Sequence, residues 1–136
     1  MATHFYLKST AFYRALAEFE SGNNDKAVGA AGEVSAFQIL PSTWKETVGE
    51  HVPLTKYNIE RRTVALSVAR QHVNLMIKSF REEVGRLPSP GEVYAMYNCG
   101  YAAFKKKNWT IEKLPKKVRD KVDRFLNLLE VKAKEL

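Results

Sequence analysis

Glu20 is the residue whose neighbours best suit it to chemistry. It ends an apolar helical pattern, directly follows Phe19, and precedes the glycine-containing segment SGNNDKAVGAAGEVS. A carboxyl group held where apolar side chains meet a groove loses solvation, which disfavours its ionised form and raises its pKa. A carboxyl group tuned in this way can act as a general acid near neutral pH. Glu20 is therefore a candidate general acid, and the competing interpretation is an ordinary solvated glutamate at a helix end.

Other familiar reactive sites are excluded by the spacing of their residues. His4, His51 and His72 lie far apart, and none belongs to an HExxH motif or a Cys/His cluster, so we expect no metal site. No GxxxxGK[ST] sequence occurs, and the glycines of GAAGEVS do not follow a convincing strand-to-helix signal for a dinucleotide. Cys99 is the only cysteine, and we interpret it as a small buried thiol. We expect no cofactor.

Four short motifs follow one another at informative distances. They are Glu20-Ser21-Gly22, Gly29-Ala30-Ala31-Gly32, Phe37-Gln38-Ile39-Leu40-Pro41 and Met96-Tyr97-Asn98-Cys99-Gly100. The ordered set resembles the lytic transglycosylases of the soluble type and their relatives, the goose-type lysozymes. That family has a catalytic Glu-Ser pair, a glycine-containing turn, a Gln-Ile-x-Pro run and a downstream Tyr-Asn-x-Gly. Gln38 follows Glu20 by eighteen residues, which is the family's usual separation, and the resemblance spans about Phe12 to Gly100.

The resemblance implies a role for each matching residue. Glu20 would protonate the glycosidic oxygen of the β-1,4 bond between N-acetylmuramic acid and N-acetylglucosamine in peptidoglycan. Ser21 and Gln38 would line the groove, Tyr97 would lie within reach of Glu20 or the sugar, and Asn98 would help to hold that wall. Two structural alternatives stay open. Gln38 would then be a buried amide that pins the loop, and the Tyr97 to Gly100 motif would be the C-terminal end of a helix.

Glu33 departs from the family pattern and bears on the mechanism. Ser35 replaces a family glycine, Glu33 stands where transglycosylases generally have no carboxylate, and the C-terminal Glu-Thr-Arg of many members is absent. Glu33 follows Glu20 by thirteen residues across a turn that could fold back. A second carboxylate about 6.5–9.5 Å from the acid can activate water for hydrolysis. Without a base, the resemblance implies that a hydroxyl of the substrate closes an anhydro ring. We expect Glu33 to take part; the alternative is an exposed turn residue, and Asp25 is a weaker candidate.

The elements that must position these residues are mainly helical. A first helix over about residues 4–20 has Phe5, Phe12, Leu16 and Phe19 near helical spacing. Glycines then break the period, which favours a small β-hairpin or irregular element over residues 21–40. The expected fold is mainly α (α+β) and lysozyme-like.

Four later helices are predicted. Boundary residues mark three of them, and the spacing of apolar residues marks the longest. Pro41 opens a short helix closed by Gly49, and Ser89-Pro90-Gly91-Glu92 is a capping box that starts another, ending near 98–100. The longest helix should run from an Asn58 cap to about Gly85. A last helix follows Pro115.

Length and composition indicate a single domain over residues 1–136. A chain of this size can bury a core without staples, and no apolar run approaches the roughly 20 residues of a membrane span. We see no signal peptide and expect a monomer. The small size, with no leader and no wall-binding module, suggests a phage lysin or virion component, cytoplasmic until release.

The net charge of +7 points to a polyanionic partner but does not choose one. Lysines concentrate at 105–107, 116–117, 132 and 134. We expect the partner to be peptidoglycan glycan strands. The alternatives are a non-catalytic helical domain that binds nucleic acid, which we disfavour, and a lysozyme-like scaffold that binds wall polymer without cutting it.

Overall fold

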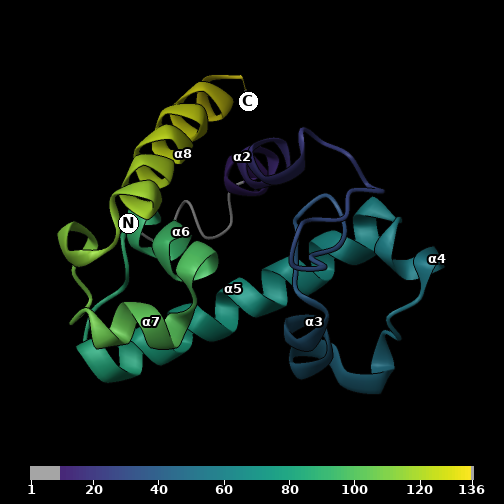
Figure 1. Ribbon diagram of the computed structural model, residues 1–136, viewed down its shortest axis with the longest axis horizontal. Coiled ribbons are helices and arrows are strands. Elements are labelled where there is room, and N and C mark those ends of the chain that lie inside the picture. Colours follow the sequence, from purple (N-terminus) through teal and green to yellow (C-terminus); the bar gives the residue numbers. More distant parts are fainter. Residues whose placement is uncertain (1–9, 136) are drawn as a thin grey trace. The chain divides into compact units, whose positions relative to one another are not determined.

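The computed structural model describes residues 10–135, which fall into two compact units. One unit comprises residues 13–74, and the other comprises residues 75–135 together with residues 10–12. Helix α2 (Thr10–Ser21) and the long helix α5 (Arg62–Val84) each contribute residues to both units, and α5 is drawn without interruption in Figure 1. We refer to the two units as the 13–74 unit and the 75–135 unit.

Helix α2 presents small and apolar side chains on its buried face. Ala15, Leu16 and Ala17 are buried in the 13–74 unit. The helix ends at Ser21, and the amides of Gly22 and Asn23 donate to carbonyls of its last turn. The predicted C-terminal end is therefore right to within one residue. The predicted start and Phe5 lie outside the described residues.

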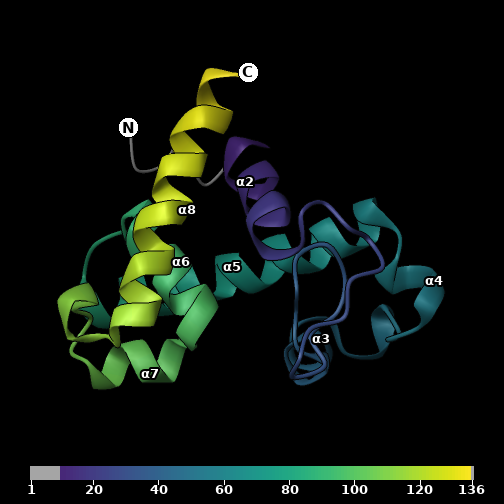
Figure 2. The ribbon, with the colours of Figure 1, turned by 45° about the horizontal axis from the view of Figure 1, so that its top comes forward.

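The segment between α2 and α3 is irregular rather than a hairpin. Its only β-type pairings in residues 10–135 are the isolated antiparallel bridges Val28 to Val34 and Val34 to Ile39, and Figure 2 shows the segment as an extended loop without strands. Ser35 and Gln38 have φ angles of 74° and 53°, in the left-handed region that a strand does not use. Of the two forms that we expected for this element, the irregular one forms.

A short helix and a 3₁₀ turn follow the irregular segment in the 13–74 unit. Helix α3 (Pro41–Val48) begins at the predicted proline and ends at Gly49, as its boundary signals predict. A 3₁₀ turn, η1 (Gly49–His51), follows. Trp44 is fully buried, and its indole Nε1 donates to the carbonyl of Val52 at 2.9 Å, which ties the chain after η1 back to α3.

The prediction that Asn58 caps the longest helix is wrong. Thr55 is the cap of a separate short helix, α4 (Lys56–Ile59), and its hydroxyl accepts the Asn58 amide. Helix α5 begins only at Arg62 and ends at Val84, one residue before the predicted stop at Gly85. The periodic pattern therefore identifies the body of α5, whereas side-chain capping by Thr55 decides how the chain enters it.

Three helices and a 3₁₀ turn follow α5 in the 75–135 unit. These are α6 (Pro90–Cys99), α7 (Tyr101–Lys106), η2 (Ile111–Lys113) and α8 (Lys116–Lys134). The capping box at the start of α6 is confirmed, because Ser89 accepts the Glu92 amide while the Glu92 carboxylate accepts the Ser89 amide. Helix α7 and η2 are short and were not predicted.

Helix α6 packs against α8 through aromatic rings and a glycine. The ring of Tyr94 stacks on that of Phe125 with centroids 4.4 Å apart, and Phe12 meets Phe125 edge-on at 5.3 Å. A Cβ at Gly91 would lie 3.3 Å from a methyl carbon of Leu126 on α8. Gly91 therefore permits the close approach of these helices.

The start of α6 is also held by an ion pair. Arg86 donates from both terminal nitrogens to Glu92, at 2.8 and 2.7 Å. Burial alone would raise the pKa of Glu92, but hydrogen bonds from Arg86 and Ser89 and the charge of Arg86 together lower it below its ordinary value. Glu92 is therefore a buried, ionised cap.

Candidate active site

Glu20 is the penultimate residue of α2, in the 13–74 unit. Both Glu20 and its neighbour Phe19 are half-buried. The carboxyl group therefore stands at the end of a helix, beside an apolar side chain and next to an irregular loop. The position at the helix end is the predicted one, and the general-acid role of Glu20 stays a prediction.

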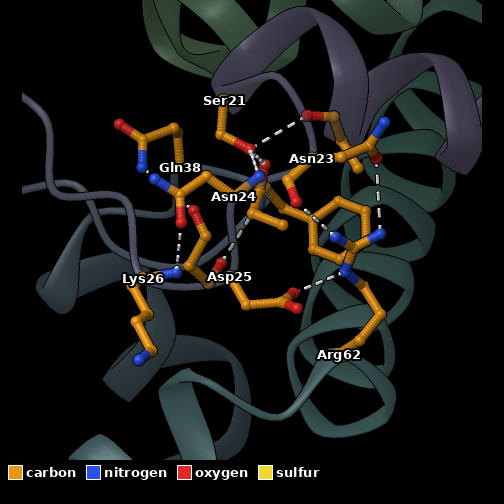
Figure 3. A network of polar contacts seen from close by, with 11 residues as sticks. Ser21, Asn23, Asn24, Asp25, Lys26, Gln38 and Arg62 are labelled. Carbon is orange, nitrogen blue, oxygen red and sulfur yellow. Dashed lines mark hydrogen bonds and ion pairs between the residues drawn. The ribbon is translucent and has the colours of Figure 1, made fainter.

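Ser21 fixes the point at which α2 gives way to the loop (Figure 3). Its hydroxyl donates to the carbonyl of Ala36 at 2.7 Å and lies 3.0 Å from that of Ala17. The same oxygen accepts the amide of Asn24 at 3.1 Å. One side chain thus joins the end of α2 to both ends of the loop. Because the hydroxyl is engaged within the protein, its role beside the substrate would be to hold Glu20 and the loop in register.

Arg62, the first residue of α5, holds the loop just after Glu20. Its Nε donates to the Asp25 carboxylate at 2.6 Å, and its terminal nitrogen donates to the Asn23 carbonyl at 3.1 Å. Its guanidinium carbon also lies 5.9 Å from the centre of the Phe37 ring. Figure 3 shows Arg62 and Asp25 facing each other. Asp25 is thus an ion-pair partner of Arg62.

Glu33 folds back over its own turn. Its Oε1 accepts the amide of Ala31 at 2.8 Å, and its backbone carbonyl accepts the amide of Gly29 at 2.8 Å. A Cβ at Gly29 would lie only 2.6 Å from this Oε1. The carboxylate therefore occupies the space that a side chain at position 29 would need. Glu33 is half-buried and its neighbour Ala31 is exposed, so its part in the reaction stays a prediction.

The side-chain oxygen of Gln38, like that of Glu33, lies close to the backbone of Gly29. Gln38 Nε2 donates to the carbonyls of Ser35 at 2.9 Å and Ala27 at 3.2 Å. Its Oε1 lies 2.6 Å from the point that a Cβ at Gly29 would occupy, so the Gln38 and Glu33 oxygens are separated by no more than twice that distance. The structural alternative for Gln38, an amide that pins the loop, is confirmed for its NH₂ group. The place of Gln38 in a substrate groove stays a prediction.

Tyr97 and Asn98 lie in the last turn of α6, in the 75–135 unit. Both are half-buried, and the Asn98 amide donates to the Tyr94 hydroxyl at 3.5 Å. The helix ends at Cys99, and the amide of Gly100 donates to the Met96 carbonyl, so the motif does form a helix end. The position of Tyr97 and Asn98 beside Glu20 stays a prediction.

Cys99 and the histidines are the residues considered for nucleophilic and metal chemistry in the sequence. Cys99 is half-buried, and burial raises the pKa of its thiol, so it stays protonated near neutral pH. Burial lowers the pKa of His72, although the charge of Glu46 opposes this shift. Among residues 10–135 no three His, Cys, Asp or Glu side chains gather as a metal site would require. His4 lies outside these residues.

A comparison with known families decides the relationship. The sequence profile described as the transglycosylase SLT domain matches residues 2–119. The chain belongs to this family. The resemblance drawn from the four ordered motifs is thereby confirmed, as is the mainly α, lysozyme-like fold. In general terms this SLT domain is a peptidoglycan-cleaving lytic transglycosylase. No curated protein and no solved structure gave a significant match.

Within this SLT domain, Arg62 is the site residue that sequence reasoning missed. It contacts Asp25 across thirty-seven residues of sequence, and no local motif marks such a pair. The one signal in the sequence is that an arginine opens the apolar period of α5, where a positive charge is unfavourable for the helix dipole.

None of the helices in residues 10–135 is long and apolar enough to cross a membrane.

Proposed function

We propose that this SLT domain cleaves the β-1,4 bond between N-acetylmuramic acid and N-acetylglucosamine, with Glu20 as its general acid. The observation that carries the proposal is the position of Glu20. The residue is half-buried at the end of α2, beside Phe19, and is followed by a serine that fastens the loop. A carboxyl group at the end of a helix and beside an irregular loop is positioned to donate a proton to a bound glycosidic oxygen.

The proton of Glu20 would pass to the glycosidic oxygen as the bond to the muramic carbon breaks. In the ring-closing reaction, a hydroxyl of the same muramic residue attacks that carbon and gives its proton to the Glu20 carboxylate, which leaves an anhydro product, restores the acid and consumes no water. Family membership favours this reaction. Ser21 and Arg62 would hold the loop, and the Gln38 oxygen would accept a hydrogen bond from a sugar group. Family membership also favours a contact of Tyr97 with the sugar, and Asn98 would help to hold Tyr97.

A second candidate reaction is hydrolysis with Glu33 as the base, and one observation favours it. The Ala31 amide donates to Glu33 Oε1, which favours one orientation of this half-buried carboxylate. Its other oxygen would then orient a water molecule for attack on the muramic carbon, as in inverting glycosidases. The products would carry ordinary reducing ends in place of anhydro ends.

The Glu20→Gln variant tests the acid. Glutamine keeps the shape of the side chain and removes its titrating proton, so clearing of purified sacculi should fall by about 10²–10⁴-fold with little change in thermal stability. Glu18→Gln is the matched control, because it makes the same change two residues earlier on α2, also at a half-buried position. If the Glu20→Gln enzyme clears sacculi near the wild-type rate, Glu20 is not the acid. If wild-type protein binds sacculi but releases no fragments, the domain is a binding scaffold.

The Glu33→Gln variant, with mass spectrometry of the released fragments, separates the two reactions. Hydrolysis predicts reducing muramic ends from the wild type and a loss of activity nearly as large as that of Glu20→Gln. Ring closure predicts anhydro ends and an active Glu33→Gln enzyme, because the glutamine oxygen can still accept the Ala31 amide. Anhydro products would rule out Glu33 as base and leave the role of Glu20 unaffected.

A further inference from the structure

The net positive charge of this chain is concentrated in one short stretch of the 75–135 unit. Residues 101–121 hold eight lysines and arginines and two acids, so they account for +6 of the total +7. The stretch covers α7, η2 and the first turns of α8. We call it the basic segment; its cations are Lys105, Lys106, Lys107, Lys113, Lys116, Lys117, Arg119 and Lys121.

Three of these cations have partners within the fold, because Lys105 and Lys116 form ion pairs and Arg119 donates to the Leu114 carbonyl. Lys105 pairs with Glu83 at 3.1 Å, and Lys116 pairs with Asp120 at 2.7 Å. By contrast, Lys106, Lys107 and Lys117 are exposed, and the structure of residues 10–135 gives them no acidic partner within 4.0 Å. Repulsion among close like charges costs stability, so a binding partner of opposite charge is the simplest physical reason for the cluster.

Two lysines of the basic segment also destabilise the N-terminal end of helix α8. Lys116 and Lys117 occupy the first turn of α8, which contains no acidic residue. Positive charges at a helix N-terminus interact unfavourably with the helix dipole. This local cost supports an electrostatic role for the segment beyond its own folding.

Aromatic residues interleave with these lysines, but they face the core. Phe104 is fully buried, and Trp109 meets the rings of Phe80, Tyr101 and Phe104 edge-on, with centroids 5.2–5.9 Å apart. Proteins that bind single-stranded nucleic acids present aromatic faces on which bases stack. In the basic segment these rings are occupied with one another. The segment therefore offers charge without a stacking platform, which suits a polyanion that has no bases.

We propose that the basic segment is a docking surface for a phosphodiester polymer attached to the cell wall, such as a chain of polyol phosphates. The peptide stems of peptidoglycan carry carboxylates, but they are spaced by whole disaccharides. A polyol phosphate places one charge in every short repeat, which matches a segment with eight cations in twenty-one residues. The inference rests on the wall as the site of action of this family and is independent of the role of Glu20. Docking there would keep the enzyme on its insoluble substrate between cleavage events.

The test compares two variants of equal charge, both built on Glu20→Gln so that cleavage does not alter the wall. One replaces Lys106, Lys107 and Lys117 by Gln. The matched control replaces Lys45, Lys56 and Lys78, which are also exposed and lie outside the basic segment. Both variants have a net charge of +5, because Glu20→Gln raises the +7 of the wild type to +8 and the three lysine changes lower it by three. The probes are purified poly(glycerol phosphate) and sacculi with and without that polymer, at several salt concentrations.

We expect the basic-segment variant to lose about tenfold or more in affinity for poly(glycerol phosphate), and the control less than about threefold. For the basic-segment variant, the slope of log affinity against log salt concentration should also become less negative by about two. A change of this size corresponds to the loss of two to three phosphate contacts. Removal of the polymer from sacculi should weaken wild-type binding and abolish the difference between the variants. Equal losses in both variants would mean that only net charge matters and would overturn the proposal. Binding of a DNA or RNA of matched charge tenfold more tightly than the polymer would also overturn it, in favour of nucleic acid. Because both readouts are equilibrium binding, their failure leaves the proposed cleavage untouched.

Discussion

Gly29→Ala is the change that most directly probes the arrangement of Glu33 and Gln38. The backbone at Gly29 lies outside the left-handed region, so alanine can adopt it. Its Cβ would nevertheless stand 2.6 Å from an oxygen of each side chain and 2.8 Å from the Glu33 carboxyl carbon. Both side chains must move away, although each is held by hydrogen bonds.

The magnitude follows from the bonds that the methyl group displaces. Glu33 accepts the Ala31 amide, and Gln38 donates to two carbonyls, so up to three hydrogen bonds of about 1 kcal/mol each are at stake. Alanine restores about 0.4–1 kcal/mol by restricting the unfolded chain. We expect a net loss of about 1–2 kcal/mol in the free energy of unfolding, and a fall of about 4–8 °C in Tm.

Two assays check this expectation. A double-mutant cycle with Glu33→Ala removes one of the two obstructing side chains, so Gly29→Ala should cost about 1 kcal/mol less in that background. Clearing of sacculi at 25 °C should also fall severalfold while the protein remains almost fully folded, because Gln38 loses its position. A Gly29→Ala protein with unchanged Tm and activity would show that the two side chains swing away freely and do not form an ordered site.

Two further predictions concern the backbone at Ser35 and the buried carboxylate of Glu92. Ser35→Gly should be at least about 1 kcal/mol more stable than Ser35→Ala in chemical denaturation, because both lose the hydroxyl and only glycine relieves the φ of 74°; equal stabilities would contradict the left-handed backbone at this position. The lowered pKa of Glu92 means that its ion pair with Arg86 contributes fully above the ordinary pKa of 4.5 and is lost as the pH falls through the lower folded value. Glu92→Gln should therefore lose about 1–3 kcal/mol at pH 7 and show a shallower decline between pH 5 and pH 3, and parallel pH profiles of the two proteins would refute this.

The parts of the fold that the sequence predicts are those with local causes. The capping box at Ser89, the proline start of α3 and the period of α5 act over a few residues, and each gives a correct helix. Thr55 shows the limit, because a threonine cap and a short turn before Arg62 separate α4 from α5 within one apolar pattern. Helix α7 is only six residues long and offers too short a period to be recognised.

For the candidate site too, the sequence predicts what local motifs mark and misses what depends on tertiary structure. Glu20, Ser21 and Gln38 were found because their order along the chain matches a family, and the structure ties Ser21 and Gln38 to the same loop. The partnership of Gly29 with Glu33 could not be predicted, since it depends on the distance from a backbone position to a side-chain tip. Whether Tyr97 joins the site is a question of tertiary arrangement that a motif on one helix does not answer.

The contact between Arg62 and Asp25 has a consequence for the order in which the protein folds. It joins residues thirty-seven apart, whereas the turns of α2 and α3 close within four. Contacts between distant residues must overcome a larger loss of chain entropy, so they form after local helices in most small proteins. Helix α2 can therefore carry Glu20 early, but the loop beside it acquires its final form only when the start of α5 is in place. A nascent or truncated chain that ends before Arg62 would lack the contacts of Arg62 with Asp25 and Asn23, and so the final form of the loop beside Glu20.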